Sequence, residues 1–207
     1  MKLVVATRSA HKLEEIRQIL AGVPGLELVG LDETALAPSP EEERLEPFDT
    51  FEENALSKAR WFAERLGLPT VADDSGIVVD ALGGAPGVRS KRFAPGDGLR
   101  GLERDLANNR HLLALLRDVP SERRTARYVC AAALVRPGRP PLVRRGEAPG
   151  LIVDEPRGSG GFGYDPHVYD PEWGGTYAEM PPEVKNAKSH RGKAFRALAE
   201  ALREEGP

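Results

Sequence analysis

The chain has 207 residues, of which 40% are hydrophobic and 29% are charged, and its formal net charge is −3 at pH 7. This length supports one good core or two small lobes that share one, and the composition excludes a chain that is disordered throughout. The acidic balance excludes the broad positive field that most nucleic-acid-binding proteins carry, so an anionic ligand needs a local cluster of basic side chains.

Neither a membrane segment nor a disulfide is expected. No apolar run approaches the roughly 20 residues of a membrane-spanning helix, and the apolar stretch that follows Met1 is too short for a signal peptide. Cys130 is the single cysteine, so no intramolecular disulfide can form. We therefore expect a cytoplasmic protein that binds neither a membrane nor nucleic acid.

The first part of the chain alternates between strand and helix patterns. In chain order, the pattern predicts a strand over 3–7, a helix over 10–20, a strand over 26–30, a Pro-rich acidic loop over 31–49 and a helix over 50–66. Thr50 and Glu53 form a candidate capping box for the last of these, and Gly67 ends it.

The later part of the chain predicts further strands, a helix and a hairpin. In order, the pattern predicts strands over 70–73 and 77–80, a helix over 99–116, a hairpin over 126–135 and 142–147, an added strand at 152–153 and a final helix over 189–202. The apolar side of the middle helix is expected to consist of Leu102, Leu106, Leu112, Leu113 and Leu116. Early alternation and a late hairpin indicate an α/β protein with a mixed sheet.

The strongest local signal of chemistry is the run Asp73-Asp74-Ser75-Gly76 between two predicted strands. Adjacent side chains on a strand point to opposite faces, so one carboxylate can face a cleft while the other holds the turn. A carboxylate at a strand end is a natural ligand of Mg²⁺, which prefers hard oxygen atoms. The alternative is an Asp-rich turn whose side chains cap backbone N–H groups.

Residues 7–12 (TRSAHK) form a polar connection between a predicted strand and a predicted helix. Backbone N–H groups at a helix start, two hydroxyls and a lysine can together bind a phosphate. The glycines of a Walker A loop are absent. The alternative is an ordinary helix start, with Ser9 as the cap and Lys12 in solvent.

Residues 185–193 contain four cationic side chains and a histidine. Ser189 is a candidate cap for the last helix, which would point His190 and Arg191 outward from its first turn. Cations at that end oppose the helix dipole, which favours a bound anion. The alternative is a solvated charge run.

Residues 158–166 match G-x-G-x-x-G, but no helix can begin at Tyr164-Asp165-Pro166, so a dinucleotide fingerprint is excluded. A glycine-rich loop with two aromatic residues can bring its backbone close to a base and stack Phe162 on it. The alternative is a tight turn that buries Phe162 and Tyr164 in the core.

Other segments suggest little further chemistry. Glu41-Glu42-Glu43 is interpreted as a solvated acidic loop, and Glu46 as either a partner of the helix dipole or a second metal carboxylate. His111 and His167 lack zinc-ligand spacing. The absence of a G-x-S-x-G sequence argues against a serine hydrolase.

Taken together and in order, these segments resemble the inosine triphosphate pyrophosphatase family, the dITP/XTP pyrophosphatases that clear non-canonical purine nucleotides. The matching stretches are 4–12, Glu46 with 50–55, 72–76, 82–87, 161–166 and 189–192. The resemblance extends from Leu3 to about Leu202 and implies a single nucleoside triphosphate pyrophosphatase domain over residues 1–207.

The resemblance implies an elongated α/β fold, in which a mixed sheet is flanked by helices in two lobes with a central nucleotide cleft, and it implies a homodimer. It also implies hydrolysis of ITP, dITP and XTP between the α- and β-phosphates, with Mg²⁺ required. The products are a nucleoside monophosphate and pyrophosphate, so the reaction cleanses the nucleotide pool.

The resemblance also implies roles by position in the matching motifs. Asp74 is expected to bind the metal and act as the general base, Glu46 to be a second metal ligand, and Asp73 to support both. The residues expected to bind phosphates and sugar are Thr7, Arg8, Ser9, Ala10, His11, Lys12, Lys58, Ser75 and Lys185. Those expected to hold the base are Phe162, Gly163, Tyr164, Asp165, His190 and Arg191.

Selectivity for a 6-oxo purine can come from N–H donors aimed at that oxygen, because an amino group would leave them unpaired. We expect these donors in His190, Arg191 and the backbone around Gly163. One departure from the family concerns the first loop, which usually reads Thr-Gly-Asn and here reads Thr7-Arg8-Ser9. Loss of the glycine restricts the backbone, whereas Arg8 adds a cation.

Two other functions remain open from the sequence. One is a pyrophosphatase of modified pyrimidine nucleotides, a group that shares the broad fold. The other is a non-catalytic nucleotide sensor.

Overall fold

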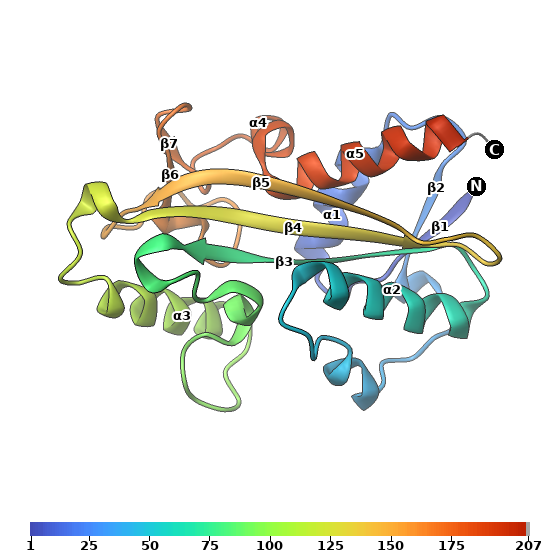
Figure 1. Cartoon of the computed structure of the whole chain (residues 1–207), viewed down its shortest axis with the longest axis horizontal. Coiled ribbons are helices and arrows are strands. Elements are labelled where there is room, and N and C mark those ends of the chain that lie inside the picture. Colours follow the sequence, from blue (N-terminus) through green and yellow to red (C-terminus); the bar gives the residue numbers. More distant parts are fainter. Residues whose placement is uncertain (206–207) are drawn as a thin grey trace. The chain divides into compact units, whose positions relative to one another are not determined.

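The computed structural model describes residues 1–205 and contains seven strands, which hydrogen-bond in the order β2-β1-β3-β4-β5-β6-β7 (Figure 1). The strands are β1 (Lys2–Val5), β2 (Glu27–Gly30), β3 (Thr70–Val79), β4 (Thr125–Val135), β5 (Leu142–Ile152), β6 (Val168–Asp170) and β7 (Gly175–Thr176). β1 pairs in parallel with β2 and β3, whereas β6 pairs antiparallel with β5 and β7. The predicted mixed sheet is therefore confirmed.

The α-helices are α1 (Ala10–Leu20), α2 (Phe51–Leu66), α3 (Gly101–Leu115), α4 (Pro182–Lys188) and α5 (His190–Glu205). Short 3₁₀ helices lie at η1 (Leu31–Glu33), η2 (Pro40–Arg44), η3 (Asp80–Leu82), η4 (Gly87–Arg92), η5 (Ser121–Arg123) and η6 (Asp165–His167). Among residues 1–205, none of the helices has the length and apolar character needed to cross a membrane.

The chain divides into two compact units, and β3, β4 and β5 contribute to both. Unit 1 contains residues 1–74, 130–146 and the chain from 186 onward, and unit 2 contains 75–129 and 147–185. Each unit has its own apolar core, so the expectation of one core or a shared one is wrong.

The core of unit 1 forms where α1 and α5 pack together on one face of the strands. Its buried residues are Leu3, Val5, Ile16, Leu20, Val71, Cys130, Ala132, Leu134, Ala194, Phe195, Leu198 and Ala199. Figure 1 shows α2 on the opposite face of these strands from α1 and α5. Helices from widely separated parts of the chain thus cover both faces of β3 within this unit.

The helix boundaries in unit 1 follow the predicted signals closely. The Ser9 side chain accepts a hydrogen bond from the Lys12 N–H at the start of α1. Thr50 accepts one from the Glu53 N–H at the start of α2, and Gly67 ends α2 with a φ of 64°. That left-handed conformation costs glycine little, which is why the helix stops there.

The core of unit 2 combines aliphatic and tyrosine side chains. Its buried residues are Ile77, Val79, Leu112, Leu116, Ala126, Tyr128, Ala148, Ile152, Tyr164, Val168, Tyr177 and Met180. β4 and β5 are neighbours joined by residues 136–141 only. A parallel pair needs a much longer crossover, so the predicted hairpin is confirmed, and β5 continues through Ile152.

The predicted break between two strands at residues 74–76 is wrong, because β3 runs without interruption from Thr70 to Val79. Gly76 allows a close approach here instead of a turn. An added Cβ at Gly76 would overlap the Ser90 side chain and the Gly87 carbonyl oxygen. The Ser90 hydroxyl accepts from the Ile77 N–H at 2.8 Å and donates to the Gly87 carbonyl at 2.6 Å, which binds η4 against the strand.

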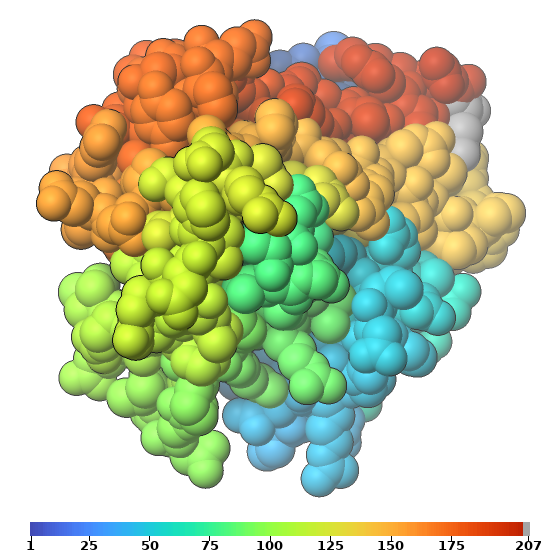
Figure 2. All heavy atoms as spheres, turned by 60° about the vertical axis from the view of Figure 1, so that its left-hand side comes forward, coloured from blue at the N-terminus to red at the C-terminus, as the bar shows by residue number. Residues whose placement is uncertain are grey.

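The predicted apolar side of the middle helix is only partly correct. Leu112 and Leu116 are fully buried, whereas Leu102 and Leu106 are 72% and 46% exposed. Asn108 sets the buried face instead, because its side chain accepts from the Ala94 N–H and donates to two carbonyl groups of η4. Figure 2 shows the yellow-green part of the chain around α3 at the surface of the face in view.

Several elements lacked a strong sequence signal. α4 precedes the final helix, and the short strands β6 and β7 lie within the segment expected to be loop. The acidic loop over 31–49 contains η1 and η2. These elements are short, so periodicity cannot identify them.

Gly192→Ala is expected to lower the free energy of unfolding by about 1–3 kcal/mol, although alanine normally favours a helix. Gly192 lies in the first turn of α5, where an added Cβ would overlap the carbonyl oxygen of Asn186 in α4. Urea unfolding measures the change. Gly22→Ala is the matched control, because its Cβ would meet nothing within 4 Å. Equal stability of the two variants would contradict the prediction.

Candidate active site

Asp73 and Asp74 lie in the middle of β3, and their buried carboxylates contact different helices of unit 1. Asp73 Oδ2 accepts from Lys12 Nζ of α1 at 3.0 Å and from Arg191 Nη2 of α5 at 3.2 Å. Asp74 Oδ2 accepts from Asn54 Nδ2 of α2 at 3.0 Å. The two carboxylates therefore point to opposite faces, as the alternation of a strand requires.

Asp73 is held as an anion by its surroundings. Burial raises the pKa of Asp73, but Lys12, Arg191 and Lys58 together lower it by more, so this pKa lies well below its ordinary value. A carboxylate with so low a pKa is a poor acceptor of a proton. Asp73 thus organises the surrounding cations and does not suit a general base.

Asp74 has the opposite character. Burial raises the pKa of Asp74 to about 6, while Lys58 lowers it and the nearby negative charge of Glu46 raises it. A carboxyl group with a pKa near neutrality can accept and return a proton at physiological pH. Of the two adjacent aspartates, Asp74 is therefore the one suited to general base catalysis.

Lys58 joins the two carboxylate sites. It projects from α2 and donates to Glu46 Oε1 and to the backbone carbonyl of Asp73. Burial lowers the pKa of Lys58, but Glu46, Asp73 and Asp74 raise it by more. Lys58 therefore remains cationic at neutral pH and is well placed to neutralise anionic charge near Asp74.

Glu46 and Asp74 fit a magnesium ion by their chemistry. The charge of Glu46 raises the pKa of Asp74, so the two carboxylates interact, and both provide hard oxygen ligands. The part of the chain from Met1 to Glu205 has no cluster of three or more His, Cys, Asp or Glu residues that could hold a metal. Two carboxylates still suit Mg²⁺, which is commonly bound by one or two carboxylates together with substrate phosphates.

The loop between β1 and α1 contains the predicted phosphate-binding residues Thr7 to Lys12. Thr7 Oγ1 accepts from the Ser9 N–H, and Ser9 in turn caps α1. Lys12 pairs with Asp73 and is only partly exposed, which contradicts the alternative of an ordinary helix start with Lys12 in solvent. The loop thus presents a helix N-terminus next to a buried carboxylate.

Arg8 forms ion pairs with the acidic loop of unit 1. Its guanidinium donates to both carboxylate oxygens of Glu42, at 3.1 and 2.8 Å, and lies 3.6 Å from Asp32. Glu41 forms an ion pair with Arg65. The expectation that Glu41 to Glu43 form a solvated acidic loop is therefore wrong for Glu42, whose side chain is mostly covered beside Arg8, whereas Glu41 remains largely exposed.

The start of α5 faces inward. Ser189 accepts from the Gly192 N–H and is the predicted cap, but His190 and Arg191 are 7% and 2% exposed. Arg191 donates to Glu15 of α1 as well as to Asp73. The expectation that these side chains point outward is wrong for Arg191, whose charge is balanced by two carboxylates of the protein.

In unit 2, residues 162–165 are organised around the Asp165 carboxylate. Asp165 Oδ2 accepts from the Phe162 N–H at 3.0 Å and from Lys185 Nζ at 2.8 Å. Asp165 Oδ1 accepts from the Tyr128 hydroxyl at 2.8 Å. Lys185 Nζ also lies 5.2 Å from the centre of the Phe162 ring, in cation–π geometry. The loop conformation is therefore fixed by its own carboxylate.

The backbone of Gly163 is held by α3. Its N–H donates to Asp105 Oδ2 at 2.9 Å, and its carbonyl oxygen accepts from Asn109 Nδ2 at 2.9 Å. The N–H groups of Phe162 and Gly163 are thus already engaged within the protein. The expectation that the backbone around Gly163 supplies donors to a base is therefore not met by these two N–H groups.

Ser75 follows Asp74 directly on β3 and is half-buried. Tyr164 is buried in the core of unit 2, and its hydroxyl donates to the Ser90 carbonyl at 2.7 Å. Phe162 is only half-buried. The alternative of a turn that buries both aromatic residues is thus met by Tyr164 and only partly by Phe162.

Sequence reasoning assigned no role to several residues that support these groups: Glu15, Glu42, Asn54, Asp105, Asn109 and Tyr128. Asn54 lies within a motif that matched the family, so that motif was the one available signal. The others are distant in sequence from their partners, and no local pattern identifies them.

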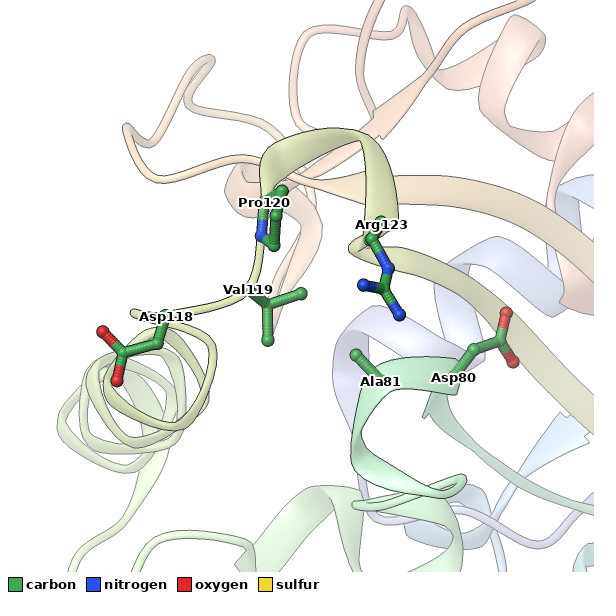
Figure 3. A pocket seen from close by; sticks show the side chains of 6 residues that line it. All are labelled: Asp80, Ala81, Asp118, Val119, Pro120 and Arg123. Carbon is green, nitrogen blue, oxygen red and sulfur yellow. The ribbon is translucent and has the colours of Figure 1, made fainter.

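Two features lie apart from the predicted residues. Cys130 is buried in the core of unit 1 as expected, and burial raises the pKa of its thiol. A cavity of about 380 Å³ in unit 2 is lined by Asp80, Ala81, Asp118, Val119, Pro120 and Arg123 (Figure 3). No predicted catalytic, metal-binding or substrate-binding residue lines this cavity.

Solved structures resemble the whole chain. A HAM1 protein from Coxiella burnetii is 36% identical, with a TM-score of 0.83 and coverage of 99% of both chains. The crystal structure of a nucleoside-triphosphatase, or dITP/XTP pyrophosphatase, from Mycobacterium abscessus is 44% identical, with a TM-score of 0.70, and the match covers 98% of this chain and 99% of that one.

Relatives in sequence also match over nearly the full length. The dITP/XTP pyrophosphatase of Nocardia farcinica is 53% identical over 204 residues, which are 97% of this chain and 94% of the relative. That of Frankia alni is 51% identical over 205 residues, which are 99% of this chain and 98% of the relative. Residues 3–201 match the Ham1 family. The chain therefore belongs to the Ham1 family.

Proposed function

We propose that this protein hydrolyses the non-canonical purine nucleoside triphosphates ITP, dITP and XTP to the monophosphate and pyrophosphate. The observation that carries the proposal is identity above 50%, over nearly the whole chain, to proteins named dITP/XTP pyrophosphatase. The paired aspartates of β3 support it, because they give one fixed anion and one titratable carboxylate side by side.

In this proposal, Asp74 accepts the proton of the water that attacks the α-phosphorus. Asn54 holds the Asp74 carboxylate in position by donating to its Oδ2 at 3.0 Å. Glu46 and Asp74 would hold Mg²⁺, which when bound supplies charge neutralisation for the triphosphate. Asp73 keeps Lys12 and Arg191 in place and thereby supports the geometry of its neighbour.

Phosphate and sugar contacts are proposed for Lys58, Ser75, Lys185 and the loop of residues 7–12. Lys58 is the best supported of these, because it remains cationic beside Asp74. Arg8 and Lys12 also remain proposed contacts, and each would exchange or share a carboxylate partner on binding. Such an exchange costs little free energy when the incoming phosphate carries more negative charge than the carboxylate.

Base contacts are proposed for residues 162–165, His190 and Arg191. The half-buried ring of Phe162 offers a stacking surface whose position is fixed by Lys185 and Asp165. A rigid polar site rejects the wrong base edge because a mismatched amino group leaves buried donors unpaired. We propose that this polar mismatch separates ITP from ATP.

The remaining parts of the proposal rest on the resemblance alone. They are that residues 1–207 act as one catalytic domain, that the protein is a homodimer and that it works in the cytoplasm. Sedimentation equilibrium of the purified protein tests the dimer, and a mass of one chain at micromolar concentration would contradict it.

The decisive assay compares ITP, dITP and XTP with ATP, GTP and pyrimidine nucleoside triphosphates at equal concentration with Mg²⁺. We expect the first three to be hydrolysed to monophosphate and pyrophosphate much faster than the others, and activity to vanish with a chelator. Equal rates for ITP and ATP, or free phosphate as the first product, would overturn the proposal. Preference for a modified pyrimidine nucleotide would favour the alternative open from the sequence.

A further inference from the structure

Two side chains one helical turn apart on α3 hold the backbone of a single residue of unit 2. Asp105 accepts from the N–H of Gly163, and Asn109 donates to the carbonyl oxygen of the same residue, each at 2.9 Å. Residues at positions i and i+4 of a helix lie on one face, so they can reach the same target. We call Asp105 and Asn109 the α3 clamp.

The conformation of Gly163 shows why its peptide groups need such partners. Its φ of 65° is left-handed, and among the protein residues described an added Cβ would meet nothing within 4 Å. The backbone there is open on one side, so packing against Gly163 itself does little to fix it. Its two hydrogen bonds to α3 therefore fix the two peptide groups on either side of the Gly163 Cα.

The Asn109 side chain is buried and donates its hydrogen bond to the Gly163 carbonyl oxygen. The residue is 6% exposed, and its Oδ1 has no hydrogen-bond partner among residues 1–205. A buried amide with an unsatisfied oxygen costs free energy that a leucine at this position would avoid. The hydrogen bond from Asn109 Nδ2 to the Gly163 carbonyl oxygen is the favourable contact that offsets this cost.

The clamp acts on the loop that carries the proposed base contacts. Within the loop, Asp165 already ties together Phe162 and Lys185. Those two bonds include neither the N–H nor the carbonyl oxygen of Gly163, which α3 binds instead. Phe162 and Tyr164 flank the clamped residue directly, so a rotation of the peptide groups on either side of Gly163 would displace the aromatic ring proposed to stack on the base.

We propose that Asp105 and Asn109 are positioning residues that set base discrimination, an inference that rests on the proposed function. They touch no substrate and act through Gly163. A loop that is rigid before binding loses little conformational entropy when it binds, and it cannot rearrange to satisfy a mismatched purine. Without the clamp, the loop adapts to either base, so preference falls while the chemical step is retained.

Isosteric variants test the clamp with opposite expectations. Asp105→Asn keeps an oxygen that accepts the Gly163 N–H, so discrimination should stay near that of the wild type. Asn109→Asp replaces the donor with an acceptor that faces the Gly163 carbonyl, so the ratio of kcat/KM for ITP to that for ATP should fall about tenfold, a change equivalent to one hydrogen bond. We expect the ratio to fall because KM for ITP rises, while kcat for ITP stays nearly unchanged.

Asn109→Ala is measured alongside, because it removes the donor without adding charge and covers the case in which Asn109→Asp does not fold. Thermal unfolding reports whether each variant is folded. The inference is overturned if folded Asn109→Ala discriminates as the wild type does, or if Asp105→Asn loses as much discrimination as the Asn109 variants. If wild-type protein itself shows no preference for ITP over ATP, the proposed function fails and this inference fails with it.

Discussion

Asp74→Asn is expected to lower kcat for ITP about 100-fold or more without unfolding unit 1. The variant removes the carboxylate that accepts the proton from water and one of two proposed metal ligands. Its amide oxygen can still accept from Asn54 Nδ2, so the local packing is retained. Steady-state kinetics with saturating Mg²⁺ and a thermal unfolding scan measure the two effects separately.

Asp80→Asn is the matched control for this variant. Asp80 follows β3 directly, but its carboxylate pairs with Thr125 and Arg127 at the edge of the cavity in Figure 3. We expect nearly wild-type activity from it. Retention of a tenth or more of the wild-type kcat by Asp74→Asn would show that Asp74 is not the general base. An inactive wild type unaffected by either change would favour the nucleotide sensor.

The parts of the fold that were predictable from sequence are those with strong local signals. The bounds of α1 follow from apolar spacing, and those of α2 follow from Thr50 at one end and Gly67 at the other. Each signal acts within one or two turns of its own helix, so no knowledge of the rest of the chain is needed.

The parts that were not predictable depend on contacts between distant segments. The sequence predicts a turn at Gly76, but glycine is needed there because Ser90 packs against the strand at that point. Leu102 and Leu106 were expected inside, but Asn108 takes the buried position through hydrogen bonds to η4. A polar residue that satisfies backbone groups can outweigh hydrophobic periodicity, because unpaired buried backbone groups are costly.

The candidate site shows the same division. That Asp73 and Asp74 face opposite ways follows from strand geometry alone, and the structure agrees. Their different pKa values do not follow from sequence, because they depend on which face receives the cations. Lys12 and Arg191 come from opposite ends of the chain and meet only at Asp73. The division of labour between two identical neighbours is thus a tertiary property.

The buried charges around Asp73 also predict a large effect on stability. Arg191→Met is expected to lower the free energy of unfolding by about 3–5 kcal/mol, because it removes the buried cation that pairs with both Glu15 and Asp73. Arg191 is 2% exposed and donates to both carboxylates. Urea unfolding without nucleotide measures the change, so a role of Arg191 in substrate binding does not enter the result.

Arg17→Met is the matched control. Arg17 lies on α1 and, like Arg191, pairs with a glutamate, in this case Glu33. Unlike in the Arg191 pairs, both side chains are substantially exposed. An exposed pair contributes about 0–1 kcal/mol, because water screens the charges and both side chains lose conformational freedom. Burial and the second carboxylate partner of Arg191 thus separate the two variants. A loss below about 1 kcal/mol for Arg191→Met would mean that Lys12, Lys58 or entering water stabilises the Asp73 carboxylate once the arginine is gone. Asp73 would then not need Arg191 to remain an anion, and Arg191 would have no part in separating the pKa values of the two aspartates.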